Sequence, residues 1–251
     1  MPYIDLNCDL GESFGAYTIG MDEKVIPFIT SANVACGFHA GDPLVMQRTV
    51  ALCKQSGVAV GAHPGFPDLQ GFGRRQMKLT PAEAKACVQY QIGALKAFCD
   101  AAGVPLHHVK PHGALYNMAG KDRALADAIC AAVKESAPGA VLLALSGSEM
   151  VKAAQAISLP VANEVFADRG YRPDGSIVPR GTPGAMIEDE DEAIARVIRM
   201  VTEGKVTAND GTDIAIQADS VCVHGDGPKA LAFVEKIGAA LQAAGVELKA
   251  F

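Results

Sequence analysis

Short apolar runs rich in β-branched residues alternate with longer segments of helical periodicity along this chain. Seven of the runs predict β-strands, at residues 3–7, 31–35, 58–62, 107–110, 140–145, 161–166 and 219–224. Strands separated by helices indicate right-handed βαβ units and a parallel sheet. We expect an α/β fold closed like a barrel, with an open doubly wound sheet as the alternative.

Two of the intervening segments carry clear helix signals. Thr80 can cap a helix over residues 81–102, where Pro81 fits the first position, Glu83 completes a capping box and Gly103 ends the helix. Residues 187–204 begin with acids, as a helix N-terminus favours. The apolar faces are Val88, Ile92, Leu95 and Cys99 in the first helix and Ile194, Val197, Ile198 and Val201 in the second.

Three loops interrupt this alternation. Residues 166–186 form a long segment rich in Gly, Pro and Arg, and loops of this length are often functional lids. Residues 63–78 form a second long loop, and residues 207–213 predict a tight turn between two short strands beside the main sheet. No repeat or linker divides the chain, so we expect one domain over residues 1–251.

Composition and charge exclude several classes of protein. The net charge of -6 comes from interspersed acids and bases, without a basic run that would favour nucleic acid. No apolar stretch approaches the length of a bilayer span, and the first residues do not resemble a signal peptide, so we expect a cytoplasmic protein without membrane contact. The seven Cys residues contain no CxxC pair and indicate reduced, buried thiols.

Polar and titratable residues gather where the predicted strands end. Parallel α/β folds build their sites at these ends, so we expect the residues to meet in one place. His107 and His108, in contrast, look incidental. The predicted site residues are Asp5, Asn7, Asp9, Glu12, Asn33, His39, Asp42, His63, Lys110, His112, Tyr116, Glu164, Asp168, Arg169, His224 and Asp226.

The first strand shows how these side chains are oriented. Strand alternation places Asp5, Asn7 and Asp9 on one face and the apolar residues between them on the other. The polar face would line the interior or mouth of a barrel, where clustered carboxylates require compensation.

Three kinds of compensation remain open. The carboxylates could bind a divalent metal together with histidines, pair with Lys110 or Arg169, or include one protonated acid. The chain has no GxxxxGK[ST] phosphate loop and no GxGxxG after a strand. The turn at residues 224–230 could hold an anion at a helix N-terminus, although an ordinary βα turn is an equal alternative. The basic residues that could hold an anion are Lys110, Arg74, Arg75, Arg169 and Arg180.

Long ordered blocks of these residues resemble the LamB/YcsF family, the A subunits of prokaryotic ATP-dependent 5-oxoprolinases. The blocks are DLNCDLGESFG, SANVACGFHAGDP, GAHPGFPDLQGFGRR, VKPHGALYN, EVFADRGY, IVPRG and VCVHGDGP. The resemblance implies a distorted seven-stranded β/α barrel similar to carbohydrate deacetylases. It also implies ATP-coupled hydrolysis of 5-oxo-L-proline to L-glutamate, with B and C partner subunits.

The site residues fit this chemistry in named roles. We expect Asp9 or Glu12 as base and His112 or His39 as proton donor or oxyanion stabiliser, with ATP handled partly by the partner subunits. A metal-dependent amide deacetylase and a non-catalytic ligand-binding barrel are the alternatives. The residues expected to bind substrate are Asn7, Asn33, His63, Lys110, Tyr116, Glu164, Asp168, Arg169, His224 and Asp226.

Overall fold

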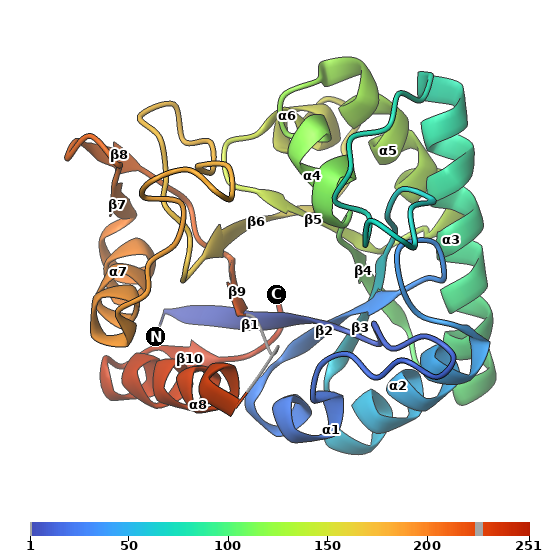
Figure 1. Cartoon of the computed structure of the whole chain (residues 1–251), viewed down its shortest axis with the longest axis horizontal. Coiled ribbons are helices and arrows are strands. Elements are labelled where there is room, and N and C mark those ends of the chain that lie inside the picture. The colour runs from blue at the N-terminus through green and yellow to red at the C-terminus, as the bar shows by residue number, and fades with distance from the viewer. Residues whose placement is uncertain (1, 224–227) are drawn as a thin grey trace.

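A computed structural model shows a ring of parallel strands surrounded by helices (Figure 1). It describes residues 2–223 and 228–251. The strands are β1 (Tyr3–Leu10), β2 (Ser31–Ala35), β3 (Ala59–His63), β4 (Leu106–Val109), β5 (Val141–Leu145), β6 (Val161–Phe166), β7 (Lys205–Thr207), β8 (Asp213–Ala215), β9 (Ser220–Val223) and β10 (Glu247–Leu248). The helices are α1 (Asp22–Val25), the 3-10 turn η1 (Ile26–Phe28), α2 (Pro43–Ser56), α3 (Pro81–Ala102), α4 (Gly113–Ala119), α5 (Arg123–Ser136), α6 (Glu149–Ala156), α7 (Glu190–Glu203) and α8 (Pro228–Ala243).

The barrel closes because β1 pairs with both of its neighbours, β2 and β9. Asp9 lies opposite Asn33 of β2, and Asp5 lies opposite Ser220 of β9. The closed order is β1, β2, β3, β4, β5, β6 and β9, all parallel. All seven predicted strands are confirmed, and the open doubly wound sheet is wrong. The short β10, which the sequence pattern did not predict, pairs with Tyr3 and Ile4 at the start of β1.

The helix signals are confirmed in detail. Thr80 and Glu83 form the reciprocal capping box of α3, and Gly103 ends the helix at φ 68°. The predicted stripe of α3 is fully buried against the sheet and α5. Asp189 caps α7, where Val197 is buried and its apolar neighbours are partly buried. These helices bury the outward face of the parallel strands, so both faces of the sheet are covered.

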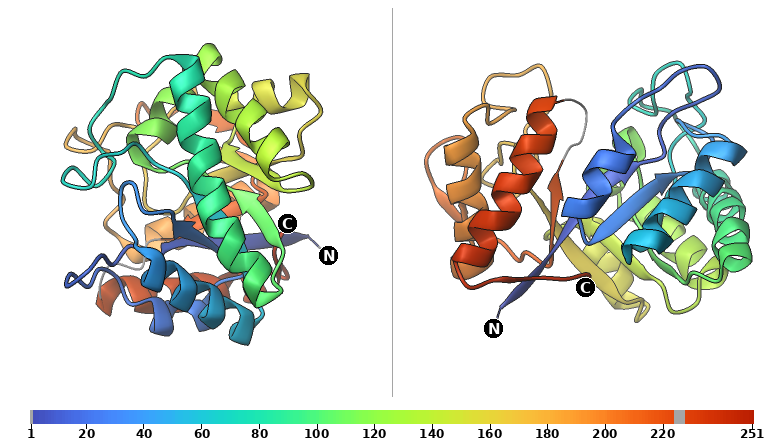
Figure 2. Two further views of the ribbon diagram at one scale, coloured as in Figure 1. Left: turned by 90° about the vertical axis from the view of Figure 1, so that its right-hand side faces the viewer. Right: turned by 90° about the horizontal axis from the view of Figure 1, so that it is seen from below.

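The long loops gather at the end of the barrel opposite the two termini (Figure 2). The loop after β6 is tied across itself by bridges between Arg169 and Met186 and between Tyr171 and Ile177. The predicted turn between two short strands is confirmed as the β7–β8 hairpin. No helix in the described part of the chain is long and apolar enough to cross a membrane.

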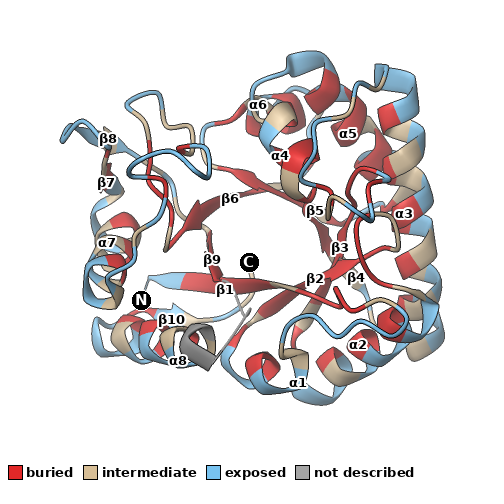
Figure 3. Cartoon of the chain, in the orientation of Figure 1, coloured by how far each residue is buried: buried red, intermediate tan, exposed pale blue. Residues whose placement is uncertain are grey.

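The strands of the barrel are largely buried (Figure 3). The buried residues nevertheless include polar ones that face the barrel interior. Strand alternation is confirmed in β1, because Ile4, Leu6 and Cys8 join the apolar core between sheet and helices, whereas Asp5 and Asn7 are equally buried on the opposite face. Hydrogen bonds between strands compensate these interior groups, as buried polar groups require. The apolar layer between the sheet and the helices therefore stabilises the barrel. The interior of the barrel contains the polar side chains.

Candidate functional site

A cavity of about 810 Å³ opens at the carboxyl ends of the strands. Its floor contains Asp9, Glu12, His63, Lys110 and His112. One wall consists of α4 and the turn before α6, and part of the loop after β6, residues 174–180, covers another side. The structure therefore brings these five of the predicted strand-end residues together in one cavity.

Asp9 lies at the centre of the floor and contacts three other strands. Its Oδ1 accepts from Lys110 Nζ at 3.0 Å and Asn33 Nδ2 at 2.9 Å, and its Oδ2 lies 3.3 Å from His63 Nε2. Burial by itself would raise the pKa of this carboxyl, but His63 and Lys110 hold the pKa well below its ordinary value. Asp9 is therefore a carboxylate, with one oxygen held and the other beside the histidines.

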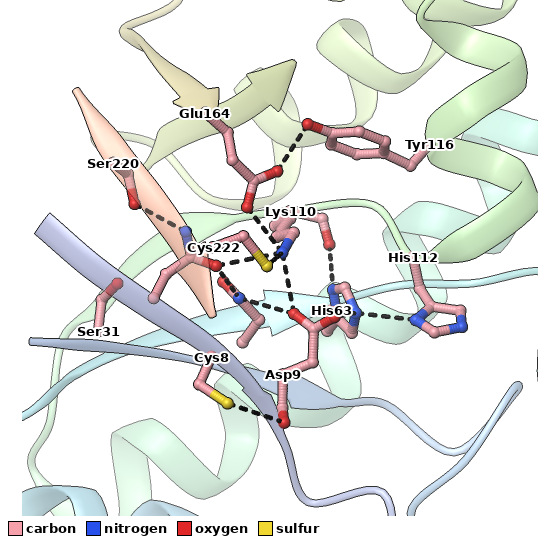
Figure 4. Close-up of polar contacts among 12 residues, drawn as sticks. Cys8, Asp9, Ser31, His63, Lys110, His112, Tyr116, Glu164, Ser220 and Cys222 are labelled. Carbon is pink, nitrogen blue, oxygen red and sulfur yellow. Dashed lines mark hydrogen bonds and ion pairs between the residues drawn. The ribbon is translucent and has the colours of Figure 1, made fainter. Parts of the chain in front are cut away.

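Lys110 is shared between two carboxylates (Figure 4). Its Nζ lies 2.7 Å from Glu164 Oε1 and 3.3 Å from Cys222 Sγ, while Tyr116 donates to Glu164 Oε2 at 2.6 Å. Burial would lower the pKa of Lys110, but Asp9 leads a group of acidic neighbours that raises it well above the ordinary value. The carboxylates of Asp9 and Glu164 therefore compensate the positive charge of Lys110 and fix the position of its Nζ.

A second group lies beside Asp9 and consists of Glu12, His39, His63 and His112, the histidine cluster. One ligand atom from each residue lies within 4.8 Å of the others, and all four residues are buried. His39 Nε2 lies 3.3 Å from Glu12 Oε1, and the ring of His39 stacks on that of His112 with centroids 3.7 Å apart. Imidazole and carboxylate are common ligands of divalent metals, so these four residues could hold one.

Backbone carbonyls orient two of the imidazoles. His63 Nδ1 lies 2.7 Å from the carbonyl of Lys110, and His112 Nε2 lies 2.8 Å from the carbonyl of Phe72. A carbonyl only accepts, so both of these nitrogens carry hydrogen. Burial, followed by the neighbouring His63, lowers the pKa of His112 to about 3, so this ring is neutral at pH 7. Its remaining nitrogen, Nδ1, therefore presents a lone pair toward His63 Nε2, 2.9 Å away.

The layer below the floor holds Asp9 in place. Asn33 donates to both Asn7 Oδ1 and Asp9 Oδ1, so its own Oδ1 accepts from His108 Nε2 at 2.7 Å. The prediction that His108 is incidental is wrong, because its ring is fully buried inside the barrel. A Cβ on Gly61 would overlap this ring, so glycine makes room for it. His108 and Lys110 are two residues apart in the predicted strand, so strand alternation places both side chains on the same face. This spacing could have identified His108 as an interior residue.

Apart from Asp5, which lies near the start of β1, the other predicted site residues fall into four groups. Tyr116 and Arg169 line the cavity, but Arg169 also donates to the carbonyls of Val178 and Ala185 within the loop after β6. The carboxylate of Asp42 caps α2 instead of reaching the floor. His224 and Asp226, with most of the predicted anion-binding turn, lie outside the described residues. The groups beneath or beside the cavity wall are Asn7, Asn33, His39, Glu164 and Asp168.

A closed parallel barrel with titratable side chains around one cavity at its carboxyl end is the architecture of a β/α-barrel enzyme. The chain belongs to the LamB/YcsF family, whose model matches residues 4–251. The resemblance noted from the sequence is thereby confirmed over nearly the whole chain.

Curated relatives extend this assignment. A protein of Clostridium beijerinckii, named as the A subunit of 5-oxoprolinase, is 64% identical over 98% of this chain and 96% of its own length. A protein of Bacillus subtilis with the same name is 58% identical over 98% of this chain and 96% of its own length.

Solved structures agree with the barrel. The lactam utilization protein of Thermus thermophilus shares 51% identity, with a TM-score of 0.94, over 99% of this chain and 100% of its own. A family 4 carbohydrate esterase of Streptomyces lividans has a TM-score of 0.51 at 12% identity, over 98% of this chain and 91% of its own. The second likeness concerns the fold alone and confirms the expected similarity to carbohydrate deacetylases.

Proposed function

We propose that this protein is the A subunit of an ATP-dependent 5-oxoprolinase and opens the ring of 5-oxo-L-proline to give L-glutamate. The observation that carries the proposal is the Asp9 carboxylate, held beside the histidine cluster at the floor of the cavity. Support comes from the relatives named as A subunits of 5-oxoprolinase and from the similar lactam utilization protein.

The reaction adds water across the amide bond of a five-membered lactam. Such an amide is resonance stabilised, so transfer of a phosphoryl group from ATP to its oxygen would create a better electrophile. Asp9 would take a proton from the attacking water and return it to the ring nitrogen as the C–N bond breaks, which leaves the phosphoryl group on the product as glutamyl phosphate. A second water would then hydrolyse this acyl phosphate to L-glutamate and inorganic phosphate. The histidine cluster would stabilise the negative charge of the phosphoryl group that the former carbonyl oxygen carries.

The remaining groups bind and enclose the substrate. Tyr116 and Arg169 line the cavity, and Arg169 offers a positive charge to the substrate carboxylate. Residues 166–186 would act as a lid that excludes water until the activated amide is bound. We further propose that Asn7, Asn33 and Glu164 act by fixing Asp9 and Lys110 rather than by contacting substrate.

We propose that the reaction also requires ATP, partner subunits and a divalent metal. The sequence contains no GxxxxGK[ST] loop, so we propose that ATP is bound together with the B and C subunits and that this chain completes the hydrolysis. The histidine cluster would hold the metal. We propose one domain over residues 1–251, located in the cytoplasm.

The decisive test measures ATP-dependent glutamate formation from 5-oxoproline with this chain alone and with its B and C subunits. We expect turnover only with the partners, and loss of turnover when Asp9→Asn replaces the native chain. Full turnover by the isolated chain would overturn the division of labour. Unchanged turnover by Asp9→Asn would overturn the assignment of the base.

A metal-dependent amide deacetylase is the second candidate, because the histidine cluster alone could activate water without ATP. An acetylated amine substrate would be hydrolysed in the absence of ATP and partners, and chelation would abolish that activity. Absence of deacetylation by the metal-loaded chain, together with ATP-dependent glutamate formation, would exclude this candidate.

A further inference from the structure

We infer that Glu12, His39, His63 and His112 form a preorganised site for one divalent transition-metal ion of the zinc, manganese, iron or cobalt class. The inference rests on the proposed function for the role of the ion in ring opening. Its existence rests on the geometry of the four side chains, and it can be tested without any substrate.

The first argument is the contact between two imidazole nitrogens, neither of which is bound by a backbone carbonyl. His63 Nε2 and His112 Nδ1 lie 2.9 Å apart, while the opposite nitrogen of each ring donates to a backbone carbonyl. His112 Nδ1 offers a lone pair, and His63 Nε2 offers a second one when its hydrogen is displaced, so a cation in this position would be bound by both nitrogens. This arrangement, a ligand histidine whose other N–H bonds to a carbonyl, is characteristic of metal sites.

The spacing of the four groups provides the second argument. Zinc binds imidazole at about 2.1 Å in tetrahedral geometry, which places ligand atoms about 3.4 Å apart. The observed separations are 2.9 Å between His63 and His112, 3.3 Å between His39 and Glu12, and 3.7 Å between His112 and Glu12. A small adjustment of these side chains would let one ion contact all of them.

The chemistry of the donors selects the class of metal. Magnesium and calcium prefer shells of oxygen ligands, whereas imidazole nitrogens suit first-row transition ions and zinc. Three imidazoles and one carboxylate therefore favour the second class. Asp9 Oδ2 lies 3.3 Å from His63 Nε2 and remains beside the site as a base.

The loop after β3 fixes the rings before any ion arrives. Phe72 adopts φ 53°, an uncommon conformation for a residue with a side chain, and its carbonyl receives the His112 N–H. A Cβ on Gly65 would meet His39 Nδ1 at 2.6 Å, and one on Gly73 would meet His112 Cδ2 at 2.8 Å. Both glycines therefore allow the backbone to lie directly against the imidazoles and restrict their movement.

The experiment uses the full chain without an affinity tag, stripped with a chelator and titrated calorimetrically with Zn²⁺, Mn²⁺, Co²⁺ or Mg²⁺. We expect one transition ion per chain, bound at least about 100-fold more tightly than Mg²⁺. The Co²⁺ form should show the visible absorption of nitrogen-ligated cobalt. Binding no tighter than that of Mg²⁺ would overturn the inference.

Variants locate the ion. His112→Gln and Glu12→Gln should each weaken Zn²⁺ binding by at least about 10-fold, the effect expected for even an indirect metal partner. His108→Gln, which alters another buried barrel histidine, is the matched control and should bind Zn²⁺ as the native chain does. If a ligand variant fails to fold, the Co²⁺ spectrum of the native chain still decides between nitrogen ligands and surface carboxylates.

The two proposals fail in different ways. Metal binding without glutamate formation in the reconstituted complex would leave this inference intact and overturn the proposed function. Glutamate formation by a complex in which this chain binds no ion would support the proposed function and overturn the metal inference.

Discussion

Asp5 and Asp9 occupy the same face of the same strand, four residues apart, yet their surroundings differ. Asp5 lies near the start of β1 and accepts hydrogen bonds from the hydroxyls of Thr30, Ser31 and Ser220. Asp9 lies near the end of β1 beside Lys110 and the histidine cluster. Asp5 is therefore surrounded by neutral hydroxyl donors, whereas Asp9 is surrounded by an ammonium group and by titratable imidazoles.

This difference shifts the pKa values of the two carboxyls in opposite directions. Burial raises the pKa of Asp5, and its hydroxyl partners oppose that rise only in part. The pKa of Asp9 is lowered despite burial, because cationic neighbours stabilise its charge. The same residue type in one strand thus meets neutral hydroxyls at one end of the barrel and charged partners at the other, where we propose that it acts as the base. Variants of Asp5, of Asp9 and of the groups that hold them test this difference.

Asp9→Asn should produce the largest effect. An amide cannot accept the proton of water, so we expect kcat for glutamate formation by the reconstituted complex to fall about 100-fold or more. Asp5→Asn is the matched control and should leave kcat within about threefold. Similar losses in both variants would show that the two carboxyls do not differ in role.

Asp5→Val should destabilise the barrel more than it affects the reaction. The substitution leaves three hydroxyls without their acceptor, and we expect a loss of about 3 kcal/mol in the free energy of unfolding. Urea denaturation of native and variant chains measures this loss. An unchanged midpoint would mean that the hydroxyl ring around Asp5 does not support the fold.

His108→Leu should disturb Asp9 indirectly. The variant removes the donor to Asn33 Oδ1, so the amide of Asn33 is no longer fixed with its NH₂ toward Asp9. We expect kcat to fall about tenfold while KM changes little, on the scale of one lost hydrogen bond to a positioned group. His108→Gln retains a donor and should restore most of kcat. Equal losses in both variants would argue for a packing role alone.

The smallest effect concerns pH. Because the folded-state pKa of Asp5 is raised above the reference value of 3.8, the folded chain takes up this proton at higher pH than the unfolded chain does. Asp5 therefore favours folding below 3.8, and this contribution is lost as the pH rises through its folded pKa. Unfolding curves of native chain and Asp5→Asn should diverge in favour of the native chain as the medium is acidified. Divergence in the opposite direction would contradict the raised pKa.

Much of this arrangement follows from the sequence, because strand alternation and helix caps are local. The alternation in β1 correctly placed Asp5, Asn7 and Asp9 inside the barrel. Local patterns could not show that Lys110 is balanced by Asp9 and Glu164, since those partners come from distant strands.

The error at His108 has the same origin. Two adjacent histidines must face opposite sides of a strand, but only the closed barrel shows which one fills the space above Gly61. The β1–β10 pairing likewise depends on contacts between the two ends of the chain.

The fit of His108 over Gly61 also sets the range of molecules that the cavity can admit. The imidazole is fully buried in the lumen and contacts the Asn33 amide that holds Asp9, so it limits how far a ligand can extend along the barrel axis. A longer molecule must instead extend sideways, toward α4 and the turn before α6. Redesign for bulkier lactams should therefore target that lateral wall, whereas a deeper pocket requires a smaller side chain at residue 108, with glycine retained at residue 61 unless residue 108 is shortened first.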